Sequence, residues 1–346
     1  MKRALEQSAE AMNDNILEDV KCCVCSNSDT ARFHIKYTKK GIDIVQCDNC
    51  SFVFIPPFYR KGITYTDYKN VDVANQVRKG NNWVKLQRHY LRYKLIRKYK
   101  PSGKLFDLGA GWGHFLLAGK ILGYEVSGIE ISEQPFLYAK NDLKLPVEHA
   151  DFFDMSENNK FDLITMWDVL EHIDRADSVV EKCARLLPAG GYLVIQVPQI
   201  DSYIAKKQGV KWNMMGLDHV NYFSKKTLTM LLEKNGFKVK TIRSSFEIKL
   251  FIMYTLFPFI SKLKSKKNGT GAEEVKQNAS NITAKRQSFF NKFTNAPKWV
   301  LRIYVLIHNL MYNALSALYI GEEMIVIAER ASDPLSGGQS AGVISS

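Results

Sequence analysis

Short apolar runs alternate with amphipathic segments through the middle of the chain, from residue 83 to residue 245. An apolar run at 105–108 ends in closely spaced glycines and leads into a helix-like stretch at 112–122. Strands that alternate with helices in this way predict an α/β domain built on a parallel sheet. The other runs that we interpret as strands are 124–130, 147–151, 161–167, 187–198, 237–242 and 321–330.

Two helices are predicted beside this series. Residues 83–100 place apolar side chains every three or four positions, so one face should pack against the domain, and Pro101 ends the segment. Asn82 could cap this helix. Ser224 is a natural N-cap for a second helix at 225–235, which Gly236 ends.

The glycines after the first strand indicate a nucleotide-like cofactor. Gly109, Gly111 and Gly113 let the backbone turn sharply and let a ligand approach without a Cβ in the way. The spacing is G-x-G-x-G, whereas dinucleotide-binding folds use G-x-G-x-x-G and place a pyrophosphate at the helix. Asp107 precedes the first glycine by two residues, where it suits a cationic amino-acid group better than a phosphate.

Two further strands end in carboxylates. Glu130 ends the second strand and could accept both hydroxyls of a ribose, and Asp151 ends the third and could accept from an adenine amine. Open parallel sheets bind ligands at the carboxyl ends of their strands, which favours contact with a cofactor. The alternative is that both residues cap helices.

The ordered set of motifs resembles the class I S-adenosylmethionine (SAM) methyltransferases. The likeness covers roughly 83–245 and resumes at 321–330. The matching motifs are D-x-G-x-G-x-G at 107–113, Glu130, Asp151, D-V-L-E-H-I at 168–173 and L-P-A-G-G at 187–191.

The resemblance implies a Rossmann-like seven-stranded sheet with an antiparallel last strand, and SAM as cofactor. Asp168 and Glu171 would then lie beside the methyl group, and His172 would be structural. Trp112 and Trp167 would pack on the adenosine or support the loop. The alternative is a fold relative that binds SAM without catalysis, or binds another nucleoside. The residues implied to bind the cofactor are Asp107, Gly109, Ala110, Gly111, Gly113, Glu130, Ile131, Asp151, Phe152, Trp167 and Asp168.

A metal signature precedes this domain. Two C-x-x-C pairs stand about twenty residues apart, and four thiolates suit tetrahedral zinc. Residues 32–37 and 41–46 alternate as a short hairpin would, so we expect a zinc ribbon whose metal is structural. His34 is the alternative ligand, and Cys23 and Cys183 are expected to be bystanders. The predicted ligands are Cys22, Cys25, Cys47 and Cys50.

A second resemblance concerns the acceptor. The segment H-x-x-Y-F-S at 219–224 is similar to one in bacterial sugar methyltransferases that also carry an N-terminal four-Cys zinc domain. That likeness implies that His219 lies near the acceptor as general base, with Tyr222 beside it. The alternative is that His219 only hydrogen-bonds its own loop. Sugar C-methyltransferases continue into a further C-terminal domain that this sequence does not show, so O- or N-methylation stays open beside C-methylation.

The stretch before the last strand departs from the family pattern. Residues 246–320 hold eleven Lys and Arg residues against three acidic ones. Within 298–320, the polar residues Lys298, Arg302, Asn309, Asn313 and Ser316 fall on one narrow helical stripe. Such a helix suits an anionic membrane surface. The alternatives are packing against the core domain, a homodimer contact, or a membrane span.

Charge and composition narrow the class of partner. The net charge of +13 favours an anionic partner surface. An RNA methyltransferase is the competing interpretation, but the predicted ribbon at 21–57 holds five Lys and Arg residues against three Asp, so it is barely basic. The first twenty residues carry no apolar run, which favours a cytoplasmic protein, peripheral on the inner face of the membrane if the insert meets lipid.

The sequence therefore predicts a SAM-dependent methyltransferase that acts on a glycan, nucleotide sugar or lipid-linked saccharide. The predicted segments are a flexible lead-in at 1–20, a zinc ribbon at 21–57, a linker at 58–82, a SAM methyltransferase domain at 83–246 and 319–330, a basic, apolar helical insert at 247–318 and a disordered tail at 331–346.

Overall fold

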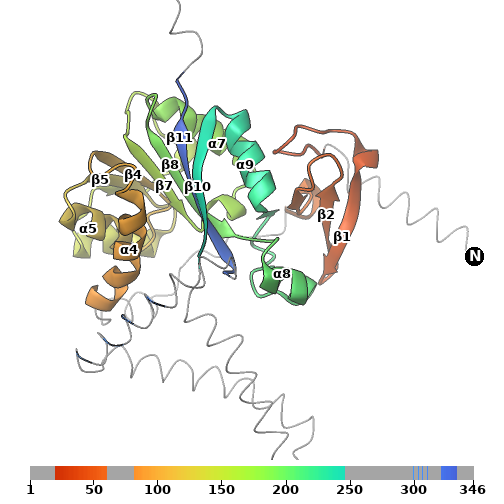
Figure 1. Ribbon diagram of the computed structural model, residues 1–346, viewed down its shortest axis with the longest axis horizontal. Helices are drawn as coiled ribbons and strands as arrows, with labels where there is room; N and C mark the ends of the chain where they lie inside the picture. The colour runs from red at the N-terminus through yellow and green to blue at the C-terminus, as the bar shows by residue number, and fades with distance from the viewer. Residues whose placement is uncertain are drawn as a thin grey trace, which may run out of the picture.

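The computed structural model describes residues 20–60, 82–245 and 321–332, and the isolated positions 299, 303, 306 and 310. Figure 1 shows a large central sheet with helices against it and a smaller sheet at the N-terminal end of the described chain. Most of the expected lead-in, linker, insert and C-terminal tail lies outside the described residues.

The central sheet has seven strands in the order β10-β11-β8-β7-β4-β5-β6. Strands β4 to β8 run parallel to one another, and β11 runs antiparallel to both β8 and β10. This confirms the expected α/β, Rossmann-like sheet with an antiparallel last strand. The strands are β4 (Lys104–Leu108), β5 (Glu125–Ile129), β6 (Val147–Glu148), β7 (Leu163–Trp167), β8 (Tyr192–Pro198), β10 (Phe237–Ser245) and β11 (Glu323–Arg330).

Helices cover both faces of the sheet. Successive residues of a strand point to opposite faces, so Leu105 of β4 packs in one cluster with α4 and α5, while Phe106 packs in another with α7 and α9. Ser224 caps α9, as expected, and forms a capping box with Thr227. The helices are α2 (Pro57–Arg60), α4 (Asn82–Ile96), α5 (His114–Ile121), α6 (Glu133–Leu137), α7 (Ala176–Leu186), α8 (Tyr203–Gln208) and α9 (Lys225–Lys234).

Short tight helical turns complete the connections. A π-helical turn, η2 (Tyr138–Asp142), extends α6. The 3-10 turns are η1 (Thr30–Arg32), η3 (Phe152–Asp154), η4 (Leu170–His172) and η5 (Gly209–Lys211).

The smaller sheet is shared between two distant parts of the chain. Its order is β1 (Phe33–Lys39), β2 (Ile42–Cys47), β3 (Val53–Phe54) and β9 (Asn221–Tyr222). The first two strands form the expected hairpin, whose two-residue turn, Lys40 and Gly41, has φ of 52° and 78°. The fourth strand comes from the loop that carries His219.

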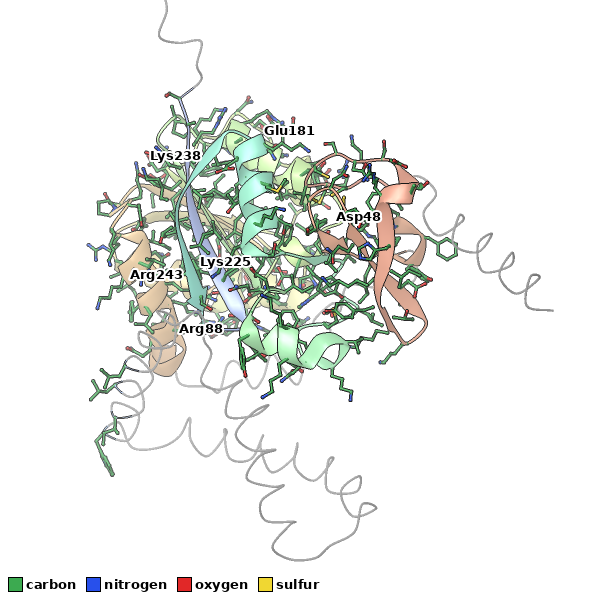
Figure 2. All side chains as sticks on the ribbon, turned by 45° about the vertical axis from the view of Figure 1, so that its right-hand side comes forward. Asp48, Arg88, Glu181, Lys225, Lys238 and Arg243 are labelled. Atoms are coloured by element: carbon green, nitrogen blue, oxygen red, sulfur yellow. The ribbon has the colours of Figure 1, made fainter. Side chains whose placement is uncertain are left out.

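The small sheet packs against the large domain rather than standing apart. Phe52 and Phe54 share one buried cluster with Leu228 and Leu231 of α9. Lys234 at the end of α9 donates to the Cys23 carbonyl at 3.3 Å and to the Ser26 hydroxyl at 2.8 Å. Figure 2 labels Asp48 next to the small sheet and Lys225 at the start of α9. The small sheet and α9 lie side by side in this view.

Three expected boundaries differ from the structure. The helix expected at 83–100 ends at Ile96, and the helix after the glycine loop begins at His114. The strand expected at 147–151 covers only Val147–Glu148 because β6 is the edge strand and pairs with β5 at two positions.

Candidate active site

The glycine loop follows β4 and leaves open space at its centre. Gly109, Gly111 and Gly113 all have positive φ, of 75°, 52° and 72°. A Cβ on Gly109 would lie 2.6 Å from Val169, and one on Gly113 would lie 2.8 Å from Leu145. A Cβ on Gly111 would meet no atom within 4 Å. The outer glycines therefore serve packing, and the central one faces the space that a cofactor would use.

Glu130 fastens this loop to the end of β5. One carboxylate oxygen accepts from the Gly111 amide at 2.7 Å and the other accepts from the Ser132 amide at 2.7 Å. A carboxylate has about four acceptor sites, so Glu130 can also accept the hydroxyls of a ribose. Ile131, next in the chain, is 58% exposed and offers an apolar surface beside the loop. These positions fit a bound nucleoside.

Asp107 lies beneath the loop, inside the sheet. Its side chain is buried and accepts from the Thr165 hydroxyl at 2.5 Å, which joins β4 to β7. Burial raises the pKa of this carboxyl to about 8. A cationic group of a cofactor would favour the ionised form. Contact between Asp107 and the amino-acid part of SAM stays a prediction, because the described side chain is enclosed.

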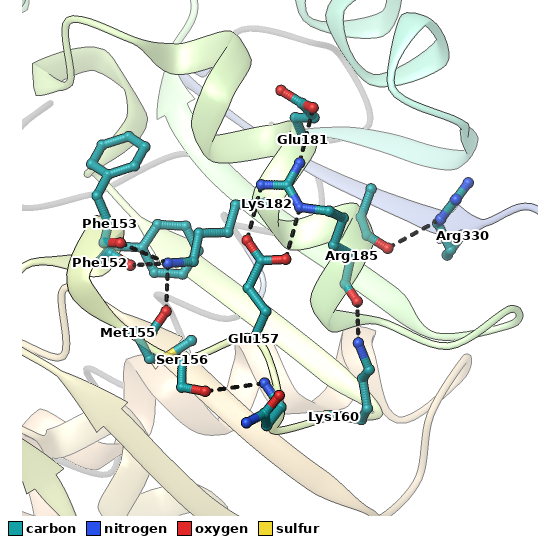
Figure 3. Close-up of polar contacts among 12 residues, drawn as sticks. Phe152, Phe153, Met155, Ser156, Glu157, Lys160, Glu181, Lys182, Arg185 and Arg330 are labelled. Carbon is teal, nitrogen blue, oxygen red and sulfur yellow. Dashed lines mark hydrogen bonds and ion pairs between the residues drawn. The ribbon is translucent and has the colours of Figure 1, made fainter.

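Asp151 and Phe152 lie at the turn after β6. Asp151 is exposed and caps η3 by accepting from the Phe153 amide at 2.8 Å, so the capping interpretation is correct for one oxygen. The ring of Phe152 is buried in the core. Lys182 of α7 holds this turn through the carbonyls of Phe152, Phe153 and Met155 (Figure 3).

Arg185 adds a second connection between this turn and α7. Its guanidinium makes two hydrogen bonds with Glu157, at 2.8 and 3.0 Å, and an ion pair with Glu181 at 2.9 Å (Figure 3). The segment that is expected to contact the adenine is therefore attached to a helix of the core.

Trp167 and Asp168 end β7, next to the glycine loop. Trp167 is buried against Phe115, and the Arg92 guanidinium lies 4.0 Å from the centre of its ring. Asp168 has φ of 60° and accepts from the Gln196 amide at 2.9 and 3.2 Å. Trp167 thus packs between α4 and α5, and its expected contact with the adenosine or the loop stays a prediction.

The structure brings His219 to the same edge of the sheet. Its ring lies 4.6 Å from the ring of His172, between centroids, at 78°. The two rings belong to segments 47 residues apart in sequence, and the Val220 amide joins them by donating to the Glu171 carbonyl at 2.8 Å. Sequence reasoning treated His172 as structural and did not predict this pairing; the only signal was the E-H dipeptide in the 168–173 motif.

Burial shifts the pKa values of His219 and Glu171. Burial lowers the pKa of His219, and the neighbouring His172 lowers it further. Burial also raises the pKa of Glu171 well above its ordinary range, and Asp168 adds to that shift. His219 is therefore a neutral imidazole at neutral pH.

Tyr222 is not brought to this group. It is a β9 residue whose side chain is buried in the core of the small sheet, and its hydroxyl donates to the Gly216 carbonyl at 2.7 Å. Burial raises its pKa above the ordinary tyrosine value. This placement favours a packing role, and a catalytic role for Tyr222 stays a prediction.

The four predicted zinc ligands converge on one point. The Sγ atoms of Cys22 and Cys50 are 3.5 Å apart, those of Cys25 and Cys47 are 3.6 Å apart, and all four lie within 4.8 Å of one another. Four sulfurs bound to one zinc ion stand about 3.8 Å apart, so the geometry fits the metal. His34, the alternative ligand, instead contacts Asp48 at 2.7 Å on the surface.

The small domain that holds the four cysteines also positions the loop that carries His219. Val53 and Phe54 of β3 pair with Tyr222 and Asn221 of β9, and the Ile55 amide donates to the Val220 carbonyl at 2.9 Å. Val220 immediately follows His219. The four-cysteine cluster is therefore connected to the histidine through one short strand pairing.

Comparison with known proteins supports a methyltransferase domain in this chain. Residues 84–242 match the family model described as a methyltransferase domain. A ubiquinone biosynthesis O-methyltransferase of Thiobacillus denitrificans is 32% identical over 110 residues, which cover 30% of this chain and 47% of that protein. A protein of the same name from Pelagibacter ubique is 24% identical over 182 residues, covering 47% of this chain and 76% of that protein.

Among solved structures, a SAM-dependent methyltransferase from Archaeoglobus fulgidus is 18% identical, with a TM-score of 0.42, and covers 70% of this chain and 94% of that chain. The chain spans about half the length of the first curated relatives that it matches.

Proposed function

We propose that this chain, which carries a class I SAM-dependent methyltransferase domain, transfers the methyl group of SAM to a glycan, nucleotide sugar or lipid-linked saccharide. One observation supports a saccharide as the acceptor. The segment 219–224, which resembles that of the sugar methyltransferases, brings His219 to the edge of the sheet where Asp168 and Glu171 follow β7. The ubiquinone O-methyltransferases match less than half of this chain, so we do not transfer their substrate to it.

The residues of the glycine loop would hold and orient the cofactor. SAM supplies a methyl group on a positively charged sulfur, which becomes neutral on transfer. Glu130 would accept the ribose hydroxyls while keeping Gly111 in place, and Asp151 has an oxygen left for the adenine amine. Holding two reactants in line can be worth an effective molarity on the order of 10⁵ M or more. Positioning is therefore the main contribution that we assign to the protein.

His219 would accept the proton of the acceptor. The Met214 carbonyl can only accept, so Nδ1 of His219 carries the hydrogen in their 2.8 Å contact. Nε2 of the neutral ring then carries a lone pair. Because burial keeps the ring neutral, His219 can act as a general base near neutral pH.

Transfer from methyl-labelled SAM to a panel of acceptors tests this proposal. The panel contains nucleotide sugars, a lipid-linked saccharide extract and total RNA. We expect label in one of the saccharide fractions. Label in RNA alone would favour the RNA methyltransferase. SAM binding without label in any fraction would favour a non-catalytic SAM-binding protein.

We also propose contact with an anionic membrane surface through the stretch before β11. The described positions 299, 303, 306 and 310 are helical and recur at helical spacing. Their side chains, Trp299, Ile303, Leu306 and Leu310, are exposed by 66%, 49%, 60% and 64%. Exposed apolar side chains beside basic residues suit the head-group region of a bilayer. Within the part of the chain that the structure describes, no helix meets the length and apolarity needed to cross a membrane.

Vesicle co-sedimentation tests this contact. The intact chain should sediment with anionic vesicles and lose that binding at high salt, because attraction of basic residues to the surface is screened. Replacing Trp299 and Leu306 together by serine should reduce binding several-fold. Ile35→Ser removes an exposed apolar residue from the small sheet, 45% exposed, and should leave binding unchanged. If the intact chain does not bind vesicles but sediments as a dimer, the exposed positions serve a second copy instead.

A further inference from the structure

Glu171, His172 and His219 form a compact group outside the residues that hold the cofactor. Glu171 and His172 belong to η4, which follows β7, and His219 comes from the loop before β9. One ligand atom from each of the three residues lies within 4.8 Å of those of the other two. Ligands about 2.1 Å from one metal ion stand roughly 3.4 Å apart, so small side-chain rotations would bring the three atoms to binding distance.

Both histidines are held in the tautomer that a metal ligand needs. Nδ1 of His172 contacts the Asp218 carbonyl at 2.8 Å, and Nδ1 of His219 contacts the Met214 carbonyl at 2.8 Å. A carbonyl oxygen only accepts, so each Nδ1 donates its hydrogen, and Nε2 is the ring atom that a metal ion would bind. Metal-binding histidines in proteins usually donate their other ring N–H in this manner.

The burial of Glu171 is a second, separate reason to expect a bound cation. Its side chain is 1% exposed, and neither carboxylate oxygen has a hydrogen-bond partner among the described residues. A buried carboxylate without a partner is costly, and a bound cation would remove that cost. Asp168 precedes Glu171 by three residues and Asp218 directly precedes His219, so further carboxylates stand on both segments that form the group and favour a cation.

We propose that Glu171, His172 and His219 bind a divalent first-row transition-metal ion of the Zn²⁺ type. Two imidazoles and one carboxylate are the ligand set of several catalytic zinc sites, whereas Mg²⁺ and Ca²⁺ prefer oxygen ligands only. Three protein ligands leave a coordination position open. This site is separate from the four-cysteine cluster, which uses all its positions for sulfur.

An open position gives the ion a role in methyl transfer. An acceptor hydroxyl bound there would lose its proton to solvent water more easily, because a metal ion stabilises the resulting oxygen anion, which then takes the methyl group. With the ion bound, Nε2 of His219 is a ligand, and the ion replaces the free imidazole as the group that activates the acceptor. Metal binding itself can be measured without any acceptor, so its failure would not be confused with failure of the proposed methyl transfer.

Elemental analysis of zinc-loaded protein tests the inference. After removal of loose metal, the intact chain should retain about two zinc ions, one in each site. Glu171→Gln and His219→Ala should each retain about one and weaken the second site at least tenfold by zinc titration, since even loss of a supporting residue costs 10- to 100-fold. Glu233→Gln, an exposed carboxylate on α9, should retain both.

The glutamine variant also separates metal loss from misfolding. It keeps the shape of Glu171 and replaces a buried carboxyl group that has no hydrogen-bond partner among the described residues, so it should fold. Zinc beyond the first equivalent should raise the thermal midpoint of the intact chain and leave that of Glu171→Gln unchanged. Retention of about one zinc ion by the intact chain, or equal titration of the intact chain and Glu171→Gln, would overturn the proposal.

Discussion

Replacing Cys22 and Cys25 together by serine is expected to release the structural zinc and to reduce methyl transfer to background. Each serine removes a thiolate, and two remaining sulfurs cannot hold zinc in a closed tetrahedral site. The four-cysteine ribbon is small, so we expect a bound metal to be needed to keep it folded. Loss of the ribbon would free β3, and β9 would lose its only strand partner within the described sheet.

The effect on activity follows from the position of β9. Val220 and Asn221 directly follow His219, and the buried cluster around Trp212 and Tyr222 includes Ile44, Val53 and Ile55 of the ribbon. Without those side chains the histidine loop loses its support. The glycine loop lies on another part of the sheet, so SAM affinity should change by only a few-fold.

Elemental analysis, limited proteolysis and SAM calorimetry on the same sample measure these effects. Cys23→Ser is the matched control, because Cys23 lies between the ligands and is not part of the four-sulfur group. It should keep its zinc and its activity. Unchanged zinc content in the Cys22/Cys25 double variant would show that other residues hold the metal.

Substitution of His219 by alanine should lower turnover about 100-fold or more and leave SAM affinity unchanged. As a free base, the ring accepts the acceptor proton; as a metal ligand, it holds the ion that activates the acceptor. Both roles are lost with the side chain. Single-turnover transfer and SAM calorimetry together separate this effect from loss of cofactor binding.

The pH dependence of methyl transfer tests whether His219 acts as a free base. Protonated imidazole cannot accept a proton, so activity should fall as the pH is lowered through the pKa of His219. Burial lowers that pKa below the ordinary value of 6.5, so the acidic limb should lie below pH 6.5. His34→Ala, an exposed histidine on the small sheet, should behave as the unmodified chain does. A loss of only about threefold in His219→Ala would leave His219 as a loop-stabilising residue.

Local patterns predicted most of the central sheet. Apolar runs, glycine spacing and capping residues are properties of neighbouring residues, so β4, the glycine loop and the Ser224 cap could be recognised without any tertiary information. Glu130 could be predicted to face the loop because strand ends in a parallel sheet share one edge. Its hydrogen bond to the Gly111 amide puts the carboxylate at that loop, whereas its expected contact with a ribose stays a prediction.

Contacts between distant segments could not be predicted from the sequence. Two residues of β9 pair with two of β3, which lies about 170 residues earlier, and that short pairing turns Tyr222 into the core. No local pattern distinguishes such a tyrosine from an active-site residue. The group of Glu171, His172 and His219 depends on the same pairing, so the sequence showed one member as a candidate base and left the other two without a shared role.

The central claim is that the chain binds SAM at the glycine loop and Glu130, and calorimetric titration with SAM tests it most directly. The intact chain should bind one SAM per chain, and Glu130→Ala should bind at least about tenfold more weakly, because charged-group hydrogen bonds of about 1.5–3 kcal/mol each are lost. Glu133→Ala removes an exposed carboxylate three residues later and should bind normally. Failure of the folded, intact chain to bind SAM, or equal affinity of Glu130→Ala, would contradict the account.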